Sequence, residues 1–356
     1  MDTSVMITLG FLVFAIVMFA WEKIPLSITA MIVAVGLHLS GVLSAKEAFA
    51  GFVDPNVLLF MGMFVIGEAF FATGVAVGVG NVVHKFAKTE TSLLVAVMMI
   101  TGVLSGFLSN TGTAAVLIPV IIGICKKSGF KQTKLLMPLV FAAAMGGNIS
   151  LIGAPGNMIA QAGLQQAGLG SFNFFDYGLV GLPILIVGTI FYATIGKRFL
   201  PDAPSHQPDG AFEGNDDYSH VPSWKKWTAA IILILTVVAM IFEKQLGVKL
   251  YVSAWIGALV LVATNVISES AAVKSIDMKT IMLFAGSMAL GDAMVKTGTG
   301  SVIADLIVNS LGASPSPIVV LVVIFVLGVF MTNFMSNTAT CALLVPIGLS
   351  LASQLG

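Results

Sequence analysis

Long apolar stretches alternate with short polar segments along most of the chain. Stretches of about twenty apolar residues are the length that a helix needs to cross a bilayer. The ten-residue alternation of apolar and polar positions that marks outer-membrane strands is missing from the sequence. The pattern therefore predicts an all-α polytopic membrane protein, with full spans at about 4–22, 25–43, 55–74, 176–199, 225–245, 249–267 and 279–297.

The composition agrees with this environment. Hydrophobic residues make up 57% of the chain and charged residues only 10%, with a mean hydropathy of +1.01. So little charge cannot cover a soluble protein of this length. Because the net charge is zero, no basic surface indicates a nucleic-acid partner. The lipid bilayer is the expected surrounding.

Two polar interruptions of apolar sequence resemble each other. Ser105–Pro119 reads SGFLSNTGTAAVLIP and Thr332–Pro346 reads TNFMSNTATCALLVP, with eight of the fifteen positions identical. Matching interruptions in the two halves of a membrane chain are the best sequence indication of a transporter's substrate site.

The apolar segments beside each interruption are too short to cross alone. Leu93–Leu108 and Thr113–Cys125 correspond to roughly 24 and 20 Å of helix. We therefore predict a re-entrant hairpin over residues 91–126, with its tip at 109–112 and a half-helix beginning at Thr113. Val319–Met335 and Ala339–Gln354 predict a second hairpin, whose returning half-helix begins at Thr340.

A third interruption lies between the two. Thr133–Gly146 runs into GGNISLIGAPGN, and a short helix follows to about Gly168. Four glycines and a proline in twelve residues cannot sustain a helix. Residues 133–168 are therefore predicted to form a helix broken within the membrane, where irregular backbone is tolerated only beside protein or a water-filled cavity.

The similarity extends to whole halves of the chain. Thr73-Gly74 matches Thr297-Gly298, and Gly67-Glu68 matches Gly291-Asp292. We predict a first repeat over 1–200, a Pro/Gly-rich linker over 201–224 and a second repeat over 225–356. The first repeat has five predicted membrane crossings. Because this number is odd, the second repeat begins on the opposite face of the membrane, and the two repeats have inverted orientations. The segments 75–88 and 299–311 are expected along the membrane interface. Gly356 corresponds to position 129 of the first repeat, so we expect the chain to be a fragment or a truncated protein that lacks the last two helices.

The distribution of lysine and arginine predicts the orientation. Cytoplasmic loops are rich in these residues. If the hairpins are arranged as predicted, thirteen of the 17 lysine and arginine residues lie on one face of the membrane and four on the other. If residues 93–125 formed a single kinked span instead, the split would be 11:6. The N-terminus is therefore expected outside the cell membrane and the linker in the cytoplasm. The four on the opposite face are Lys46, Lys244, Lys249 and Lys296.

The interruptions predict ion chemistry. A helix that begins within the membrane directs free N–H groups and about half a positive charge into the gap, and one that ends there directs carbonyls and about half a negative charge. Such ends, with Ser, Thr and Asn oxygens, bind an anion and a hard cation. No lysine or arginine is expected near the midplane, so bound Na+ would balance the anion and couple the two.

These motifs together resemble the divalent anion/sodium symporter (DASS) family, within the ion transporter superfamily. The resemblance rests on two Ser-Asn-Thr triplets on opposed hairpins and a G-x-P-x-N loop in the broken helix. It implies an elevator-type homodimer that carries a dicarboxylate, citrate or sulfate with Na+ as the coupling ion. The implied substrate contacts are Asn110, Thr111, Ser336, Asn337 and Thr338; the implied Na+ ligands are Ser105, Ser109, Asn110, Gly153, Thr332, Met335 and Asn337.

One departure from the family pattern affects the substrate. Where the family often has GTPPN, this chain has Gly153-Ala154-Pro155-Gly156-Asn157. The loop loses a hydroxyl and a rigid proline, which leaves the choice among dicarboxylate, citrate and sulfate open. The short central linker favours carboxylates. Sodium stoichiometry, and symport as against exchange, also stay open.

Two other functions remain as alternatives. Glu68 and Asp292 occupy equivalent positions within the membrane, where a carboxylate is a functional candidate, so the chain is alternatively a cation/proton antiporter or a Na+-independent anion exchanger. An intramembrane enzyme is not expected, because the sequence has no H-E-x-x-H motif and Ala289 replaces the first glycine of a G-x-G-D protease motif.

Overall fold

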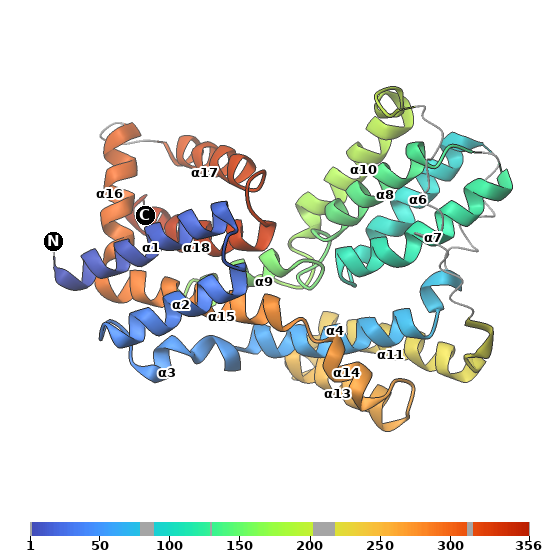
Figure 1. Ribbon diagram of the computed structural model, residues 1–356, viewed down its shortest axis with the longest axis horizontal. Helices are drawn as coiled ribbons and strands as arrows, with labels where there is room; N and C mark the ends of the chain where they lie inside the picture. Colours follow the sequence, from blue (N-terminus) through green and yellow to red (C-terminus); the bar gives the residue numbers. More distant parts are fainter. Residues whose placement is uncertain (1, 79–88, 129, 202–217, 312–315, 356) are drawn as a thin grey trace. The chain divides into compact units, whose positions relative to one another are not determined.

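The computed structural model describes residues 2–78, 89–128, 130–201, 218–311 and 316–355. The predicted interface segment 75–88 and the linker 201–224 therefore lie largely outside the described residues. Within the described ranges every regular element is helical (Figure 1). The predicted all-α class is confirmed for this part of the chain.

The helix bounds follow the predicted ranges within a few residues. The short 3-10 helices are η1 (Ala50–Val53), η2 (Gly196–Arg198) and η3 (Tyr218–His220). The α-helices are α1 (Thr3–Trp21), α2 (Leu26–Leu39), α3 (Ala45–Ala48), α4 (Pro55–Ala72), α6 (Glu90–Ser105), α7 (Asn110–Ser128), α8 (Thr133–Gly146), α9 (Pro155–Gln166), α10 (Gly178–Thr194), α11 (Ser223–Ile241), α12 (Glu243–Leu246), α13 (Leu250–Ala263), α14 (Glu269–Ser275), α15 (Met278–Thr297), α16 (Thr299–Leu311), α17 (Pro317–Met331) and α18 (Asn337–Leu355).

Four of the described helices, α1, α4, α11 and α15, are long and apolar enough to cross a membrane. The predicted spans 25–43 and 249–267 are shorter than expected, because α2 and α13 have only 14 residues each, about 21 Å. Both helices are followed by a residue in the left-handed conformation, Gly41 with φ 78° and Asn265 with φ 55°. That conformation ends a helix.

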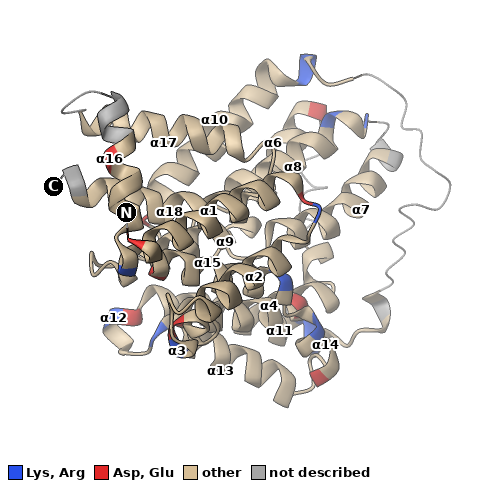
Figure 2. Ribbon diagram, turned by 60° about the vertical axis from the view of Figure 1, so that its left-hand side comes forward, with Lys and Arg blue, Asp and Glu red and all other residues tan. Residues whose placement is uncertain are grey.

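Several helices have no charged residue and expose large apolar side chains. Figure 2 shows α1, α10, α13 and α17 without a charged residue along their length. On α17, Ile318, Leu321 and Phe325 are exposed, and Val320 is the one described side chain of that helix that is buried. Large exposed apolar surfaces are costly in water. They fit the lipid surroundings that the composition predicts.

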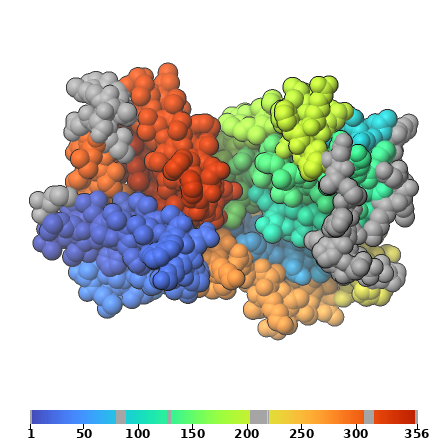
Figure 3. Space-filling model, turned by 45° about the horizontal axis from the view of Figure 1, so that its top comes forward, coloured from blue at the N-terminus to red at the C-terminus, as the bar shows by residue number. Residues whose placement is uncertain are grey.

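The described chain forms two compact units, and each is considered separately. Unit 1 comprises residues 1–58, 158–171 and 277–356. In it the N-terminal helices lie beside C-terminal ones, blue against orange in Figure 3. The core brings Leu37 and Phe19 together with Leu290 and Met294 of α15. A methyl group on Gly286 would overlap the backbone of Ala30, so α2 and α15 cross at close range.

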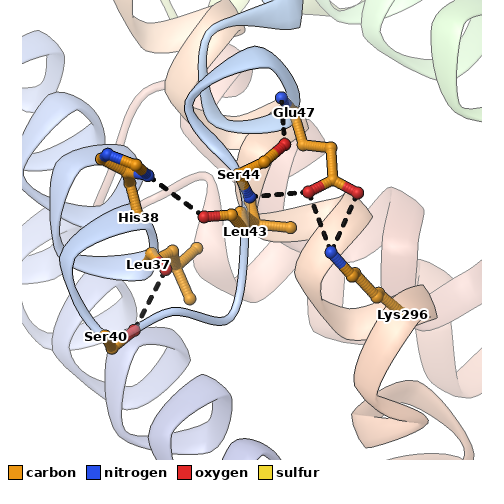
Figure 4. Close-up of polar contacts among 7 residues, drawn as sticks. All are labelled: Leu37, His38, Ser40, Leu43, Ser44, Glu47 and Lys296. Carbon is orange, nitrogen blue, oxygen red and sulfur yellow. Dashed lines mark hydrogen bonds and ion pairs between the residues drawn. The ribbon is translucent and has the colours of Figure 1, made fainter.

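In unit 1 an ion pair links the C-terminal end of α15 to α3 (Figure 4). The Lys296 ammonium donates to both Glu47 carboxylate oxygens at 2.9 and 2.8 Å. Glu47 also belongs to a capping box, because Ser44 N–H donates to its carboxylate at 2.7 Å and the Ser44 hydroxyl accepts from Glu47 N–H at 3.3 Å. These bonds, that to Lys296 foremost, lower the pKa of Glu47 from 4.5 to about 2.

Unit 2 comprises residues 59–157 and 172–276. Its core joins α6, α7, α8 and α10 through Leu93, Met98, Ile121, Leu135 and Leu185. A methyl group on Gly146 would overlap the backbone of Gly102, so α6 and α8 touch along their backbones. Gly62 of α4 meets Ala254 of α13 in the same way. Each compact unit thus contains helices from both predicted repeats, and the repeats remain a prediction about the sequence.

Candidate functional site

The first polar break separates α6 from α7. Helix α6 ends at Ser105 and α7 begins at Asn110, three residues before the predicted start at Thr113. The reason is an N-cap at Ser109. Its hydroxyl oxygen accepts from Gly112 N–H at 3.0 Å, and its carbonyl accepts from Thr113 N–H at 2.9 Å. Because a cap serine satisfies the first N–H groups of a helix, Asn110 and Thr111 lie in the first helical turn.

The second polar break repeats this arrangement. Helix α17 ends at Met331 and α18 begins at Asn337, again three residues before the predicted start, at Thr340. The Ser336 hydroxyl accepts from Ala339 N–H at 3.1 Å, and its carbonyl accepts from Thr340 N–H at 3.0 Å. The same cap therefore forms 227 residues later.

Each break also pairs a hydroxyl with an asparagine amide. The Ser105 hydroxyl oxygen lies 2.7 Å from the Asn110 amide, and the Thr332 hydroxyl contacts the Asn337 amide. These pairs again lie at equivalent positions. In both, the last residue of one half-helix or its cap is linked to the first residue of the next.

The orientation of the Asn110 amide follows from its neighbours. The single Ser105 hydroxyl proton is used by the Ala143 carbonyl at 2.7 Å, so the hydroxyl oxygen is free to accept. With its nitrogen turned toward Ser105, Asn110 donates to Ser105 Oγ at 2.7 Å, Gly153 O at 3.1 Å and Ala143 O at 3.3 Å. Three oxygens therefore surround one position beside Asn110.

The α8–α9 break supplies part of this cluster. Two of its side chains were not among the predicted site residues: Ser150, whose hydroxyl donates to the Gly106 carbonyl, and Asn157, whose amide donates to the carbonyls of Gly147 and Ser150, each at 2.9 Å. Tyr177 adds a bond to the Asn157 carbonyl at 2.8 Å. Asn157 thus satisfies backbone groups that the missing helical turn leaves free. Its place in the G-x-P-x-N loop was the available signal.

Two glycines allow this close packing. A Cβ on Gly147 would lie 2.6 and 2.7 Å from the two terminal atoms of the Asn110 amide, and one on Gly153 would lie 2.5 Å from the Gly147 carbonyl oxygen and 3.0 Å from that of Gly106. Real Cβ atoms do not approach backbone oxygens so closely. The loop between α8 and α9 therefore reaches the α6–α7 break only as bare backbone.

The predicted site residues fall into two groups. In unit 2, Ser105 and Gly153 are buried, Asn110 is half-buried, and Ser109 and Thr111 are exposed. In unit 1, Met335 is buried, Thr332, Ser336 and Thr338 are half-buried, and Asn337 is exposed. The structure brings Ser105, Asn110 and Gly153 together, and it pairs Thr332 with Asn337. Ser109 and Ser336 use their hydroxyls as helix caps.

The chemistry of both breaks is that of uncharged oxygen and N–H groups. Hydroxyl, amide and backbone carbonyl oxygens are ligands for hard cations, while the first turns of α7 and α18 present N–H groups that favour anions. The predicted proton carriers are placed elsewhere: Glu68 and Asp292 are half-buried in the interior of α4 and α15.

Several known proteins similar to this chain are described as transporters. An uncharacterized transporter of Haemophilus influenzae is 28% identical over 98% of this chain and 77% of its own length. The uncharacterized transporter YfbS of Escherichia coli K12 is 33% identical over 59% of this chain and 35% of its own. The sodium-dependent dicarboxylate transporter SdcS of Staphylococcus saprophyticus is 24% identical over 92% of this chain and 69% of its own.

These similarities place the chain among transporters, with no enzyme among the similar proteins. The chain spans about a third of the length of the E. coli relative and about three quarters of that of the H. influenzae one. Its resemblance to sodium-dependent dicarboxylate carriers is confirmed by the match to SdcS. Residues 16–356 match a family described as citrate transporter. The chain belongs to this CitMHS family, within the ion transporter superfamily.

Proposed function

We propose that this protein carries a divalent organic anion, citrate or a dicarboxylate, across the cell membrane together with Na+. The family description names citrate, and the S. saprophyticus relative is named as sodium-dependent and as a dicarboxylate transporter. Sulfate is the third candidate that the Ser-Asn-Thr motifs allow. Ala154 and Gly156, which replace two residues of the family's usual loop, stand where they would affect this choice.

The observation that carries the proposal is the oxygen cluster at Asn110. The oxygens of Ser105, Ala143 and Gly153 lie within 2.7–3.3 Å of one amide nitrogen. An N–H donor and a small cation are attracted by the same oxygens. A turn of the amide would replace the nitrogen by Oδ1 and leave a set of uncharged oxygens for Na+. Ser105, Asn110 and Gly153 are therefore the proposed core of the first Na+ site, with Ser109 at its edge.

The second site is proposed on the equivalent residues. Thr332, Asn337 and the Met335 carbonyl are the Na+ ligands there, because Thr332 and Asn337 are paired as Ser105 and Asn110 are. The proposed substrate contacts are taken unit by unit. They are Asn110 and Thr111 at the start of α7 in unit 2, and Ser336, Asn337 and Thr338 at the start of α18 in unit 1. The N–H groups at each helix start favour carboxylates.

Matched helix bounds support the inverted-repeat architecture behind this proposal. Helices α2 and α13 both have 14 residues, and each is followed by a left-handed residue at an equivalent position, Gly41 or Asn265. Ser44 and Ser268, equivalent again, cap α3 and α14. On this basis α6–α7 and α17–α18 are proposed to be re-entrant hairpins of an elevator-type homodimer, with the N-terminus outside and the linker cytoplasmic.

Uptake into proteoliposomes tests the function. The protein is reconstituted, and labelled citrate, succinate and sulfate are offered with an inward Na+ gradient or with choline in its place. We expect uptake of one carboxylate that requires Na+ and is lost in Asn110→Ala. Uptake that ignores Na+ would identify an exchanger, and Na+ movement driven by a proton gradient without any anion would identify an antiporter that uses Glu68 and Asp292.

A further inference from the structure

Two buried threonines share one unusual property at equivalent positions. Thr113 is 1% exposed and Thr340 is 6% exposed. Each is the fourth residue of its helix, counted from Asn110 or Asn337. Both hydroxyl oxygens lack a hydrogen-bond partner, although leaving a buried polar group without a partner lowers the stability of the fold. Such a group calls for a physical explanation.

Other threonines in the described helices behave differently. The usual partner of a helical threonine is the carbonyl four residues earlier. Thr73 donates to Ala69 O at 2.7 Å and Thr189 to Leu185 O at 2.8 Å, and Thr8, Thr194, Thr264 and Thr297 do the same. For Thr113 and Thr340 the corresponding carbonyls belong to the caps Ser109 and Ser336, yet their hydroxyls do not use them.

The remaining buried hydroxyls without a partner among the described residues are those of Thr29, Thr101, Thr133 and Ser253. Thr29 and Ser253 lie next to Ala30 and Ala254, where helices cross at close range. Thr101 has glycine at the position 227 residues later, and Thr133 is the first residue of α8, at the end of that helix opposite the break. The pair at 113 and 340 is therefore the one that recurs at both polar breaks.

Helix geometry directs both hydroxyls toward the breaks. Each Cα–Cβ bond in a helix tilts toward the N-terminus. Residues three apart share a face of the helix, with Cβ atoms about 5–6 Å apart. Thr113 therefore lies on the same face of α7 as Asn110, and Thr340 lies on the same face of α18 as Asn337. In unit 2 this places the Thr113 side chain one turn beneath the amide that contacts Ser105 and Gly153.

We propose that the hydroxyl oxygens of Thr113 and Thr340 are further Na+-binding groups, one at each polar break. This inference rests on the proposed Na+-coupled function. Burial selects the cation over the anion: a carboxylate substrate must enter and leave through groups that are exposed, such as Thr111 and Asn337, whereas a monatomic cation fits against an oxygen with almost no exposed surface. A hydroxyl oxygen is a suitable ligand for a hard cation.

The experiment measures Na+ binding without any substrate. The thermal stability of the purified protein is followed against Na+ concentration, at constant ionic strength with choline. Valine has the shape of threonine without the hydroxyl, so Thr113→Val and Thr340→Val are compared with Thr113→Ser and Thr340→Ser, which retain it. Thr194→Val, at an exposed position where the hydroxyl is satisfied within the helix, is the control.

We expect each valine variant to raise the Na+ concentration for half-maximal stabilisation about tenfold, the effect of one lost polar interaction. The serine variants and Thr194→Val should stay within about twofold of the wild type. Valine variants with an unchanged Na+ response, in a wild type that does respond, would overturn this inference alone. A wild type whose stability ignores Na+ would overturn the proposed coupling ion as well.

Discussion

The two polar breaks have the same local structure and different surroundings. Ser109 and Ser336 cap their helices through equivalent bonds, and an asparagine follows each cap. Around Asn110, however, α8 and the loop that follows it add the oxygens of Ala143 and Gly153. Asn337, by contrast, is exposed and contacts Thr332. The triplet thus dictates the cap, and a separate broken helix supplies the enclosure.

This comparison separates what a motif does locally from what it needs from other elements. Capping bonds span four residues, so the sequence of the triplet is enough to form them. The cluster at Asn110 joins residues 105, 110, 143 and 153 across three helices. It also depends on Gly147 and Gly153, because any side chain there would occupy the space of the amide or of a carbonyl.

The largest expected effect is on transport. Asn110→Ala and Asn337→Ala should each reduce Na+-driven uptake about a hundredfold or more, because each removes an amide from a proposed site at which two interactions of about 1.4 kcal/mol are lost. Uptake into proteoliposomes at fixed protein density measures this. Na+-driven uptake retained in both variants would reject the proposed sites.

The same two variants should differ in stability. Asn110→Ala removes the amide that donates to Ser105 Oγ and to the Gly153 carbonyl and should cost about 1–3 kcal/mol of unfolding free energy. Asn337→Ala, at an exposed position, should cost less than about 1 kcal/mol. Denaturant unfolding in detergent compares them. Equal losses would mean that the α8–α9 loop does not distinguish the two breaks.

The glycine contacts give a second test of the enclosure. Gly153→Ala should destabilise the protein by about 1–3 kcal/mol, because the methyl group would meet two backbone carbonyls that cannot move independently. Gly123→Ala in α7 is the matched control, since a Cβ there meets nothing within 4 Å, and alanine favours a helix by up to about 1 kcal/mol. If both substitutions have the same effect on thermal unfolding, the predicted close approach is wrong.

The smallest effect concerns pH at the end of α15. The pKa of Glu47 is lowered from 4.5 to about 2, so its ion pair with Lys296 stabilises the fold above pH 4.5, and this contribution disappears as the pH falls toward 2. Lys296→Gln should flatten the pH dependence of the melting temperature in that range. Lys249→Gln, which removes a longer contact of 3.5 Å to Glu243, is the control and should leave the dependence as it is.

Much of the fold follows from apolar pattern alone. The apolar stretches predict most helices to within a few residues, and Thr133–Gly146 and Thr299–Leu311 have the predicted bounds. The starts of α7 and α18 were misplaced by three residues, because Asn and Thr have low helix propensity and the cap that outweighs it lies at the preceding serine. The early ends of α2 and α13 depend on single left-handed residues, which hydropathy does not register.

The candidate site was predictable in its residues and much less so in its contacts. The repeated triplets identify Asn110 and Asn337 from the sequence. The contributions of Ser150 and Asn157 depend on which carbonyls the broken helix leaves free, and this requires the three-dimensional structure. The close approach of Gly146 to Gly102 is likewise a long-range feature that no local pattern encodes.

The crossings of α2 with α15 and of α4 with α13 have a consequence for biosynthesis. When α2 leaves the ribosome, α15, whose Gly286 packs against Ala30, has not yet been translated. The first half of the chain therefore enters the bilayer with small-residue surfaces uncovered. Native packing of unit 2 can be completed only after α13 is inserted, and that of unit 1 only after α15 is inserted.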